Sequence, residues 1–354
     1  MSKNIKVYVG MSGGVDSSVT AALLKEQGYD VTGVYMKNWS QDLPGFECPW
    51  KEDFQDAKRV AVQLDIPFKM YDFETEYRER VVDYMLDGYK AGITPNPDIM
   101  CNQEVKFKLF LETALADGAD MIATGHYARI SDGLLLTGID GNKDQSYFLY
   151  RVTDNALKQS LMPIGEYEKP SVRELAKKFG LATAEKKDSQ GICFVGKVGI
   201  KEFLQQFVTT EPGAIVDANG TVIGEHDGAL FYTIGQRHGL NVGGGLPYYV
   251  VGKNMAKNEV YVTTDLQDPK LWTSELTITS PHWINQPPEE GATYGVRTRY
   301  RAPLVTCTIK KDGDNWRILM DEEVRALTPG QSAVLYEQHG DKGSYRVVGG
   351  GIVI

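Results

Sequence analysis

The first residues that suggest chemistry form a glycine- and serine-rich stretch between an apolar run, residues 5–9, and a helical pattern, residues 19–25. Two adjacent glycines allow a sharp turn that presents backbone N–H groups to an anion, and the N-terminus of the following helix adds its positive dipole end. The strand, loop and helix therefore predict a phosphate-binding loop, with a plain glycine turn as the alternative. The residues expected to bind a nucleotide are Gly10, Met11, Ser12, Gly13, Gly14, Val15, Asp16 and Ser17.

This loop differs from the Walker type, in which a lysine follows the last glycine. Val15 and Asp16 stand at that point of the chain. Transfer of a terminal phosphate, as in kinases and GTPases, is therefore disfavoured.

A second reactive stretch lies around Cys101, just before a helical apolar pattern at residues 107–115. Two prolines in the segment 94–102 hold it stiff and extended. A cysteine at the start of a helix is stabilised as a thiolate by the helix dipole. Asp98 is near enough in the chain to transfer protons, although a capping aspartate and a core cysteine are the alternatives.

A third stretch, residues 186–196, is polar at first and ends in a short apolar run that contains Cys193. A buried core cysteine is the simpler interpretation of that residue. Cys101 and Cys193 together, however, would support persulfide or disulfide chemistry that one thiol cannot.

The elements that must position these residues alternate between strands and helices. We expect strands at 31–35, 67–71 and 121–123 and helices at 54–64, 76–89 and 171–180, the last with a capping box from Ser171 to Glu174. Such alternation predicts a parallel sheet with ligands at the carboxyl ends of its strands.

Three candidate site residues fall at these strand ends. Met36 is expected to flank a base and Gly125 to allow close approach of a nucleotide, while a core methionine is an equal alternative for Met36. His126 is either a base or phosphate contact or a packed loop histidine. The polar turn at 141–146 suits nucleic-acid contacts, with a solvated turn as the alternative.

Length and composition set limits on the class of protein. A chain of 354 residues with net charge −9 exceeds the size at which a single core keeps growing and has no uniformly basic surface for nucleic acid. It contains no apolar run long enough to span a membrane and no signal peptide, and its four cysteines lack zinc-like spacing. We therefore expect a cytoplasmic protein with no membrane association and no protein-bound metal cluster.

Beyond residue 200 the pattern changes to antiparallel strands. Hairpin turns are predicted at Asn219-Gly220 and Asp312-Gly313. Arg297, Arg299 and Arg301 alternate, which would place them on one face of a strand as a basic surface for phosphates, with a solvated edge strand as the alternative. We predict three domains: a catalytic domain at 1–205, a small central β domain at 206–273 and a C-terminal β-barrel at 274–354.

Seven motifs in order, spread over essentially the whole chain, carry a family resemblance. They are GMSGGVDSS, YMKNW, TPNPDIMCN, ATGHYAR, KDQSYFL, KDSQGICFVG and YTIGQRHGL. The first resembles the loop of the ATP-pyrophosphatase superfamily, which cleaves ATP between the α- and β-phosphates. The whole series resembles the tRNA-specific 2-thiouridylases.

The resemblance implies an α/β fold, in which an adenine-nucleotide α-hydrolase-like domain with a parallel sheet precedes a small β domain and a β-barrel. It implies ATP with Mg²⁺ bound by the loop, Met36 and Gly125, and catalysis by Asp98, Cys101 and Cys193. The residues implied to meet the target uridine or the rest of the tRNA are Asn96, Pro97, Asp98, His126, Lys143, Asp144, Gln145, Arg299, Tyr300, Arg301 and Gln331.

The implied reaction is 2-thiolation of the wobble uridine of the anticodon. ATP would adenylate the oxygen on carbon 2, and a cysteine persulfide loaded by a sulfur-relay protein or cysteine desulfurase would supply sulfur to a monomeric enzyme. The alternatives are another ATP pyrophosphatase of the superfamily, or a nucleotide-regulated RNA-binding protein without catalysis.

Overall fold

The computed structural model describes residues 5–42, 47–187, 199–240, 242–243, 245, 247–340 and 343–354. Its first part is a five-stranded parallel sheet in the order β3-β2-β1-β4-β7. The strands are β1 (Lys6–Gly10), β2 (Asp30–Lys37), β3 (Phe68–Asp72), β4 (Met121–Ala123) and β7 (Ser160–Leu161). The predicted parallel sheet is thus confirmed.

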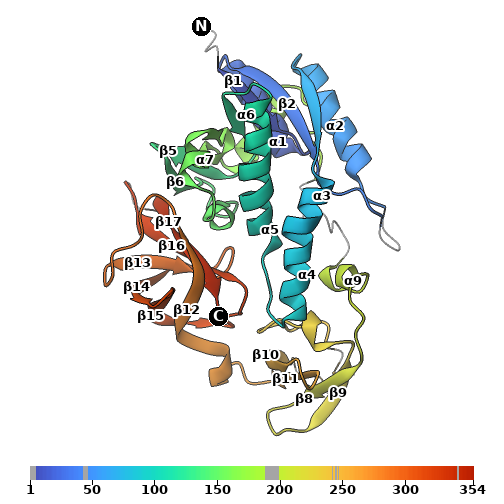
Figure 1. Cartoon of the computed structure of the whole chain (residues 1–354), viewed down its shortest axis with the longest axis vertical. Helices are drawn as coiled ribbons and strands as arrows, with labels where there is room; N and C mark the ends of the chain where they lie inside the picture. The colour runs from blue at the N-terminus through green and yellow to red at the C-terminus, as the bar shows by residue number, and fades with distance from the viewer. Residues whose placement is uncertain are drawn as a thin grey trace.

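Helices connect these strands and cover the sheet (Figure 1). Because β1 is buried from Val7 onward, its β-branched side chains pack on both faces of the sheet, as expected of a central parallel strand. The helices of this region are α1 (Val15–Glu26), α2 (Trp50–Gln63), α3 (Glu74–Tyr77), η1 (Arg78–Val82), α4 (Asp83–Lys90), η3 (Ser146–Leu149), α7 (Asp154–Lys158), η4 (Pro163–Glu166), α8 (Lys169–Lys178) and α9 (Ile200–Leu204).

One long helix of this region carries the reactive segment, residues 96–101, which includes Asp98 and Cys101. It runs without a break through α5 (Pro97–Met100), the π-helical stretch η2 (Cys101–Leu109) and α6 (Phe110–Ala116). Figure 1 shows it beside α4, extending from the sheet toward the β-rich half of the molecule. Its apolar side chains Val105, Phe107 and Phe110 are buried in the largest core cluster.

The middle of the chain forms a four-stranded sheet in the order β10-β11-β8-β9. Its strands are β8 (Gly213–Val216), β9 (Val222–His226), β10 (Tyr249–Asn254) and β11 (Glu259–Thr263), and the short helices η5 (Ala229–Phe231) and η6 (Pro269–Leu271) accompany them. The predicted hairpin at Asn219-Gly220 joins β8 to β9, with Gly220 at φ +80°.

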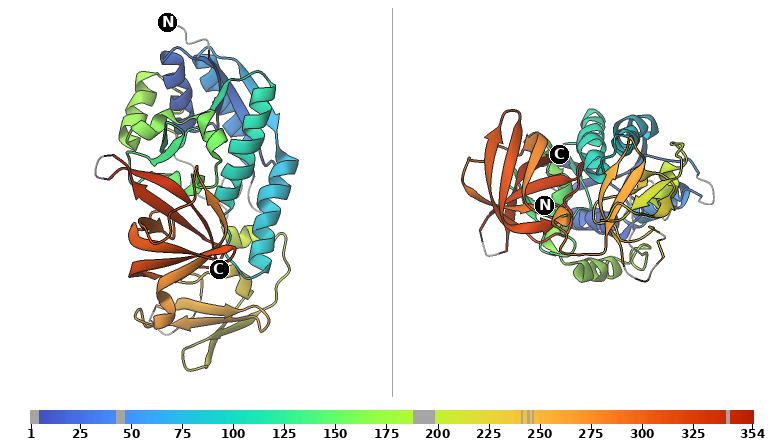
Figure 2. Two further views of the ribbon diagram at one scale, coloured as in Figure 1. Left: turned by 60° about the vertical axis from the view of Figure 1, so that its left-hand side comes forward. Right: turned by 90° about the horizontal axis from the view of Figure 1, so that it is seen from below.

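The last part is a closed antiparallel barrel of six strands in the order β12-β15-β14-β13-β16-β17, closed by pairing of β12 with β17. Figure 2 shows the barrel against the helices of the first part. Asp312 pairs with Asn315, so the β14–β15 turn is centred one residue later than predicted. The strands are β12 (Trp272–Trp283), β13 (Thr293–Arg297), β14 (Val305–Asp312), β15 (Asn315–Arg325), β16 (Ser332–Gln338) and β17 (Tyr345–Val353).

The barrel sheet also takes in two strands from early in the chain. The hairpin of β5 (Ala128–Ser131) and β6 (Leu134–Thr137) extends it, with Leu136 paired to Arg346 of β17. Arg129 adds a hydrogen bond to Ser344 Oγ at 2.8 Å. The proposed division at 205/206 and 273/274 stays a prediction, and its second boundary falls two residues into β12.

Within the described residues, no helix is long and apolar enough to cross a membrane.

A buried ion pair joins the barrel to the first part of the chain. Asp144 is buried and accepts hydrogen bonds from the backbone N–H groups of Gly138 and Ser146, both at 3.1 Å, and from Ser146 Oγ at 3.0 Å. Its Oδ2 lies 2.7 Å from Nη1 of Arg297 at the end of β13. The carboxylate is therefore satisfied entirely by protein groups from the two parts.

Substitution of Asp144 by Ala should destabilise the protein by about 3–5 kcal/mol, because it leaves the Arg297 charge buried without its partner. Glu275→Ala removes the carboxylate of an exposed pair with Arg317 and should cost about 1 kcal/mol or less. Denaturant unfolding of both variants measures the difference. Equal losses of stability would show that the Asp144 pair contributes no more to folding than an exposed ion pair.

Candidate active site

The predicted phosphate-binding loop lies between β1 and α1, at the carboxyl edge of the sheet. Gly13 adopts φ +74°, and a Cβ there would lie 2.4 Å from the carbonyl oxygen of Asp53. Only glycine fits, because the backbone conformation and the space both exclude a side chain. Gly14 is the N-cap of α1, and no side chain caps the helix, which leaves its first-turn amides to face a ligand.

The serines of the loop hold it in shape. Ser17 Oγ accepts from the Ser12 N–H at 3.2 Å and donates to the carbonyl of Gly14 at 3.2 Å, while Ser18 Oγ donates to the same carbonyl at 2.7 Å. Ser12 itself is exposed and its hydroxyl lies 3.3 Å from Ser17 Oγ. The main role of these hydroxyls is therefore to hold the shape of the loop. Contact with an anion would be a second role.

Two residues of the loop pack their side chains into the hydrophobic core. Met11 and Val15 are 1% and 3% exposed and pack in the cluster behind the sheet. Their predicted contact with a nucleotide can come only from the backbone.

Met36 and Gly125 lie beside the loop, as strand-end positions should. A Cβ on Gly10 would come within 2.9 Å of Met36 Cε, and a Cβ on Gly125 within 2.8 Å of the Ser17 backbone nitrogen. The neighbouring strands β2, β1 and β4 thus bring all three predicted segments to one edge. Their role in binding a nucleotide stays a prediction.

Asp16 of the loop is held by residues distant in the chain. Lys169 Nζ lies 2.7 Å and 2.9 Å from its two carboxylate oxygens, and the Tyr127 hydroxyl donates to Oδ1 at 2.8 Å. Lys169 is only 8% exposed. This buried ammonium offsets the negative charge of Asp16, which would otherwise repel phosphates at the loop.

Sequence reasoning missed Lys169 because it placed the start of this helix at Ser171. The capping-box prediction is wrong: α8 begins at Lys169, with Glu168 as N-cap, no side-chain cap and Pro170 in the first turn. Proline is favoured at the first turn of a helix because it lacks the N–H that would be unpaired there. The pair Lys169-Pro170 was the signal that could have found the true start.

A second lysine near the loop is Lys186. Lys186 Nζ lies 2.8 Å from Asp53 Oδ1 and 2.6 Å from Asp56 Oδ2, both on α2. Asp53 is the residue whose carbonyl faces Gly13. The chain that leads toward Cys193 is therefore tied to the loop side of the sheet, although Cys193 itself lies outside the described residues.

The reactive segment begins with a capped helix turn. Asn96 is the N-cap of α5, where its Oδ1 accepts from the Ile99 N–H at 3.3 Å, and Pro97 occupies the first turn. Burial raises the pKa of the half-buried Asp98, while the positive charge of Lys106 opposes that shift. Cys101 follows one turn later and is 2% exposed.

Between the loop and this segment lies His126. Its ring is buried 5.6 Å from that of Phe107, and its Nδ1 lies 2.8 Å from Thr124 Oγ1. Burial first, and the charge of Lys106 second, hold the pKa of His126 well below its usual value. The positive charge of Lys106 thus acts on both His126 and Asp98. The ring contact between His126 and Phe107 joins the strand end at β4 to the reactive helix.

The polar turn at 143–145 supports its surroundings. Besides the Asp144 pair, Gln145 Oε1 accepts from the Tyr127 N–H at 2.9 Å, and the Gln145 N–H donates to the Tyr127 carbonyl at 2.9 Å. Lys143 is partly exposed on the same turn. Direct contact of these residues with tRNA stays a prediction.

The arginines of the last domain differ from expectation. Arg297 ends β13, and Arg301 has φ +61°, so the alternation on one strand face is wrong. The chain turns at this point because Arg299 folds inward: its Nη2 donates to the Ile234 carbonyl at 3.2 Å and to Thr328 Oγ1 at 2.9 Å. Tyr300 packs on Phe148 with ring centroids 4.5 Å apart.

Arg301 is exposed, and its Nε donates to the Asn142 carbonyl at 2.9 Å, next to the 143–145 turn. Gln331 lies apart from both, near the reactive segment, where its Nε2 donates to the Thr94 carbonyl at 2.8 Å. The structure thus divides the predicted RNA contacts into two places.

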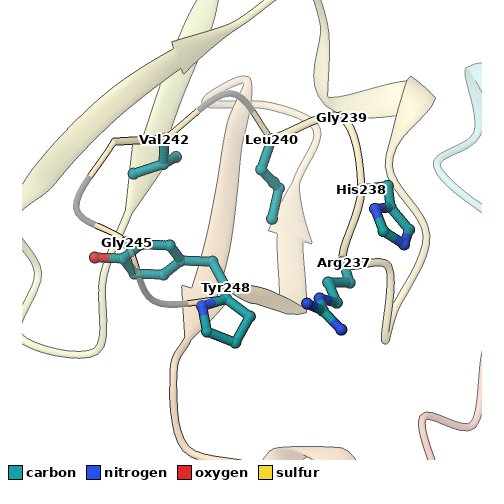
Figure 3. A pocket seen from close by; sticks show the side chains of 8 residues that line it. Arg237, His238, Gly239, Leu240, Val242, Gly245 and Tyr248 are labelled. Atoms are coloured by element: carbon teal, nitrogen blue, oxygen red, sulfur yellow. The ribbon is translucent and has the colours of Figure 1, made fainter.

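A cavity of about 350 Å³ lies in the middle part of the chain. Figure 3 shows Arg237 and His238 on one side of it and Val242 and Tyr248 on the other. Arg237 and His238 belong to the motif YTIGQRHGL and are exposed.

Comparison with known proteins matches the three structural parts in order. Residues 5–197 match the tRNA methyl transferase HUP domain, residues 201–264 the tRNA methyl transferase PRC-barrel domain, and residues 273–353 the aminomethyltransferase beta-barrel domain. The chain is 49% identical to the tRNA-specific 2-thiouridylase MnmA of Bacillus subtilis (strain 168), over 95% of this chain and 92% of that protein. It is 48% identical to the protein of the same name from Bacillus thuringiensis (strain Al Hakam), over 94% and 91%.

Among solved structures, a 4-thiouridine synthetase–RNA complex with bound ATP is similar at TM-score 0.38 and 19% identity, covering 57% of this chain and 50% of that one, which is too slight to carry an argument.

The parallel sheet with its glycine-serine loop, followed by two β domains, places the chain among proteins built on a HUP domain. Within that class, the chain belongs to the tRNA-specific 2-thiouridylase family.

Gly13→Ala should impair ATP binding by the loop, whereas Gly118→Ala serves as its matched control. Both glycines have positive φ, but a Cβ on Gly118 meets nothing within 4 Å. Both variants should lose about 1–2 kcal/mol of stability from the backbone conformation. Only Gly13→Ala should also weaken ATP binding, by about tenfold or more, because Asp53 must move. Calorimetry with ATP measures this, and unchanged affinity would refute the proposed site.

Proposed function

We propose that the protein is an ATP-dependent sulfurtransferase that converts the wobble uridine of tRNA anticodons to 2-thiouridine. Membership of the 2-thiouridylase family supports the substrate and the product. The structural observation that carries the proposal is the bridge between two sites: Gly125 packs on the phosphate-binding loop, and the next residue, His126, packs on the helix that carries Asp98 and Cys101.

In the first step the loop binds ATP. Its amides and the N-terminus of α1 stabilise negative charge on the phosphates, while Lys169 offsets the charge of Asp16. The oxygen on carbon 2 of the uridine attacks the α-phosphorus, and pyrophosphate leaves. A poor leaving group has then become an AMP ester.

Mg²⁺ fits this site in the form that accompanies nucleotides. The described residues contain no group of three or more His, Cys, Asp or Glu side chains that could hold a metal ion. Mg²⁺ commonly binds through one or two carboxylates together with substrate phosphates. Asp16 would be the carboxylate, and the ion would neutralise charge on the phosphates.

In the second step sulfur replaces the activated oxygen. A sulfur-relay protein or cysteine desulfurase loads Cys193 as a persulfide, whose terminal sulfur attacks carbon 2 while AMP leaves with the oxygen. Cys101 then attacks the Sγ of Cys193, which forms a disulfide and releases the thiolated base; a thiol reductant restores both residues. In the alternative route, the Cys101 thiolate attacks the Sγ of the Cys193 persulfide, which forms the disulfide and releases hydrosulfide; the hydrosulfide then attacks carbon 2 while AMP leaves.

Asp98 is the proposed proton-transfer residue. As a base it would remove the N3 proton of the uracil, which makes the carbon-2 oxygen more nucleophilic. Burial raises the pKa of Asp98 and so makes its carboxylate a stronger base than that of an exposed aspartate.

The tRNA must present the uridine outside the anticodon stack, as is usual when proteins read or modify a loop base. Asn96, Pro97 and Asp98 would meet that base. We propose that His126, the turn at 143–145, Arg299, Tyr300, Arg301 and Gln331 position the rest of the anticodon region around a monomeric, cytoplasmic enzyme.

The decisive experiment follows pyrophosphate release from ATP with and without anticodon stem-loop RNA, together with mass analysis of the nucleosides. We expect RNA-dependent release and exchange of sulfur for oxygen at the wobble uridine. A persulfide donor protein is included in the assay.

Two other outcomes would redirect the proposal. Pyrophosphate release without sulfur exchange in wild-type protein would favour another ATP pyrophosphatase, and no release at all would favour an RNA-binding protein. Cys193→Ser should keep pyrophosphate release and lose thiolation. Full thiolation by that variant would exclude the persulfide role of Cys193.

Asp98→Asn should lower the rate of thiolation by about 10²-fold or more, because it removes the proton-transfer group. In the wild type, activity should fall as the pH decreases through the raised pKa of Asp98, since the base is then protonated. Single-turnover rates across the acidic range measure both effects. A rate that instead falls only as the pH rises would assign Asp98 as the acid.

A further inference from the structure

Thr94, four residues before Asp98, is held by groups from both β domains. Its backbone N–H donates to the Pro329 carbonyl at 2.9 Å, and its carbonyl accepts from Gln331 Nε2 at 2.8 Å. Its hydroxyl lies 3.1 Å from that of Thr233 in the middle part. Thr94, which precedes the reactive segment, is therefore held by the barrel and by a loop of the middle part of the chain.

Movement of Thr94 would be transmitted to the catalytic residues. Pro95 and Pro97 restrict the backbone between Thr94 and α5, and Asn96 caps the helix directly. Pro95 is packed against Gly88 of α4, where a Cβ would lie 2.8 Å from the proline ring. Such a stiff connection cannot absorb a displacement, so Asp98 and Cys101 would shift with Thr94.

On the barrel side the attachment is rigid. The Gln331 N–H donates to the Thr328 carbonyl at 3.2 Å, and its carbonyl accepts from the Val353 N–H at 2.8 Å. Gly330, at φ +92°, lies so close to Thr94 that a Cβ would come within 2.9 Å of its backbone. Gln331 is thus a fixed support from which one amide group reaches Thr94.

The hydrogen bond, and not packing, keeps that amide in place. A cavity of about 360 Å³ adjoins Gln331 and is lined also by Thr233, Ile234, Gly235, Gln236, Arg299 and Thr328. Because the side chain has open space beside it, loss of the bond would leave the Thr94 carbonyl without its donor and free to shift.

We propose that Gln331 is a positioning residue, which acts through the Thr94 carbonyl and together with Thr233 to set the place of Asp98 and Cys101. The inference deepens the proposed function and rests on it. This role is additional to the RNA contact proposed for Gln331, because it uses the amide nitrogen that is bonded to Thr94. Contacts of the barrel with RNA would then be communicated to the reacting base through Thr94.

The test compares Gln331→Ala with Gln338→Ala in the full-length protein. Gln338 is the same residue type, exposed at the far end of β16. Gln331→Ala should lower kcat at saturating tRNA by about 10- to 100-fold, since small displacements of reacting groups cost that much. Its Tm should stay at the wild-type value, and the kcat, the Tm and the Kd for tRNA (by filter binding) of Gln338→Ala should all stay at the wild-type values.

Thr233 provides a second pair of variants should Gln331→Ala fail to fold. Thr233→Val removes the hydroxyl and should lower kcat, whereas Thr233→Ser keeps it and should restore the rate. Hydrogen exchange of the amides of residues 94, 96, 98 and 99, measured without RNA, should accelerate in Gln331→Ala and in Thr233→Val. It should stay at the wild-type rate in Gln338→Ala and in Thr233→Ser.

A raised Kd for tRNA with kcat and hydrogen exchange both intact would make Gln331 an RNA contact only and overturn the proposal. Unchanged kcat and unchanged exchange would overturn it as well. If wild-type protein fails to thiolate tRNA, the proposed function fails instead, and the exchange measurement still tests the support of Thr94.

Discussion

The buried contact between Asp144 and Arg297 fixes how the barrel meets the nucleotide-binding sheet, and the arrangement of the site depends on it. A carboxylate with four donors and almost no water around it permits one orientation of the two parts, since displacement would leave charge unpaired in a medium of low dielectric. With the barrel so placed, its 329–331 loop reaches Thr94, and Arg299 reaches the middle sheet.

The reactive helix spans the distance between two chemistries. Its far end packs under the sheet, where Phe110 lies near Gly10 of the phosphate-binding loop. Its near end begins at the residue that both β domains hold. In the proposed reaction, activation of an oxygen and delivery of sulfur therefore take place at positions set by one stiff element, and His126 packs on that element between them.

The parallel sheet, the loop and the strand-end residues could be predicted from the sequence. This is because β-branched runs favour buried strands and glycines favour tight turns, whatever the rest of the chain does. The sequence was insufficient where long-range contacts decide. Lys169 acquires meaning only when α8 packs beside α1, and the alternation of Arg297, Arg299 and Arg301 suggested a strand that the inward hydrogen bonds of Arg299 bring to an end. The partners of Asp144 and Gln331 lie 153 and 237 residues away, beyond the reach of any local pattern.

The hairpin of β5 and β6 has a consequence for synthesis of the chain. It is complete once residue 137 has been made, yet its partner strand β17 begins only at Tyr345. At typical ribosomal rates the roughly 200 intervening residues take about 10–40 s. During that time the nascent first domain presents an unpaired strand edge, a site for pairing with other chains. Each strand of the hairpin has only four residues, which keeps that edge short while the barrel is still being made.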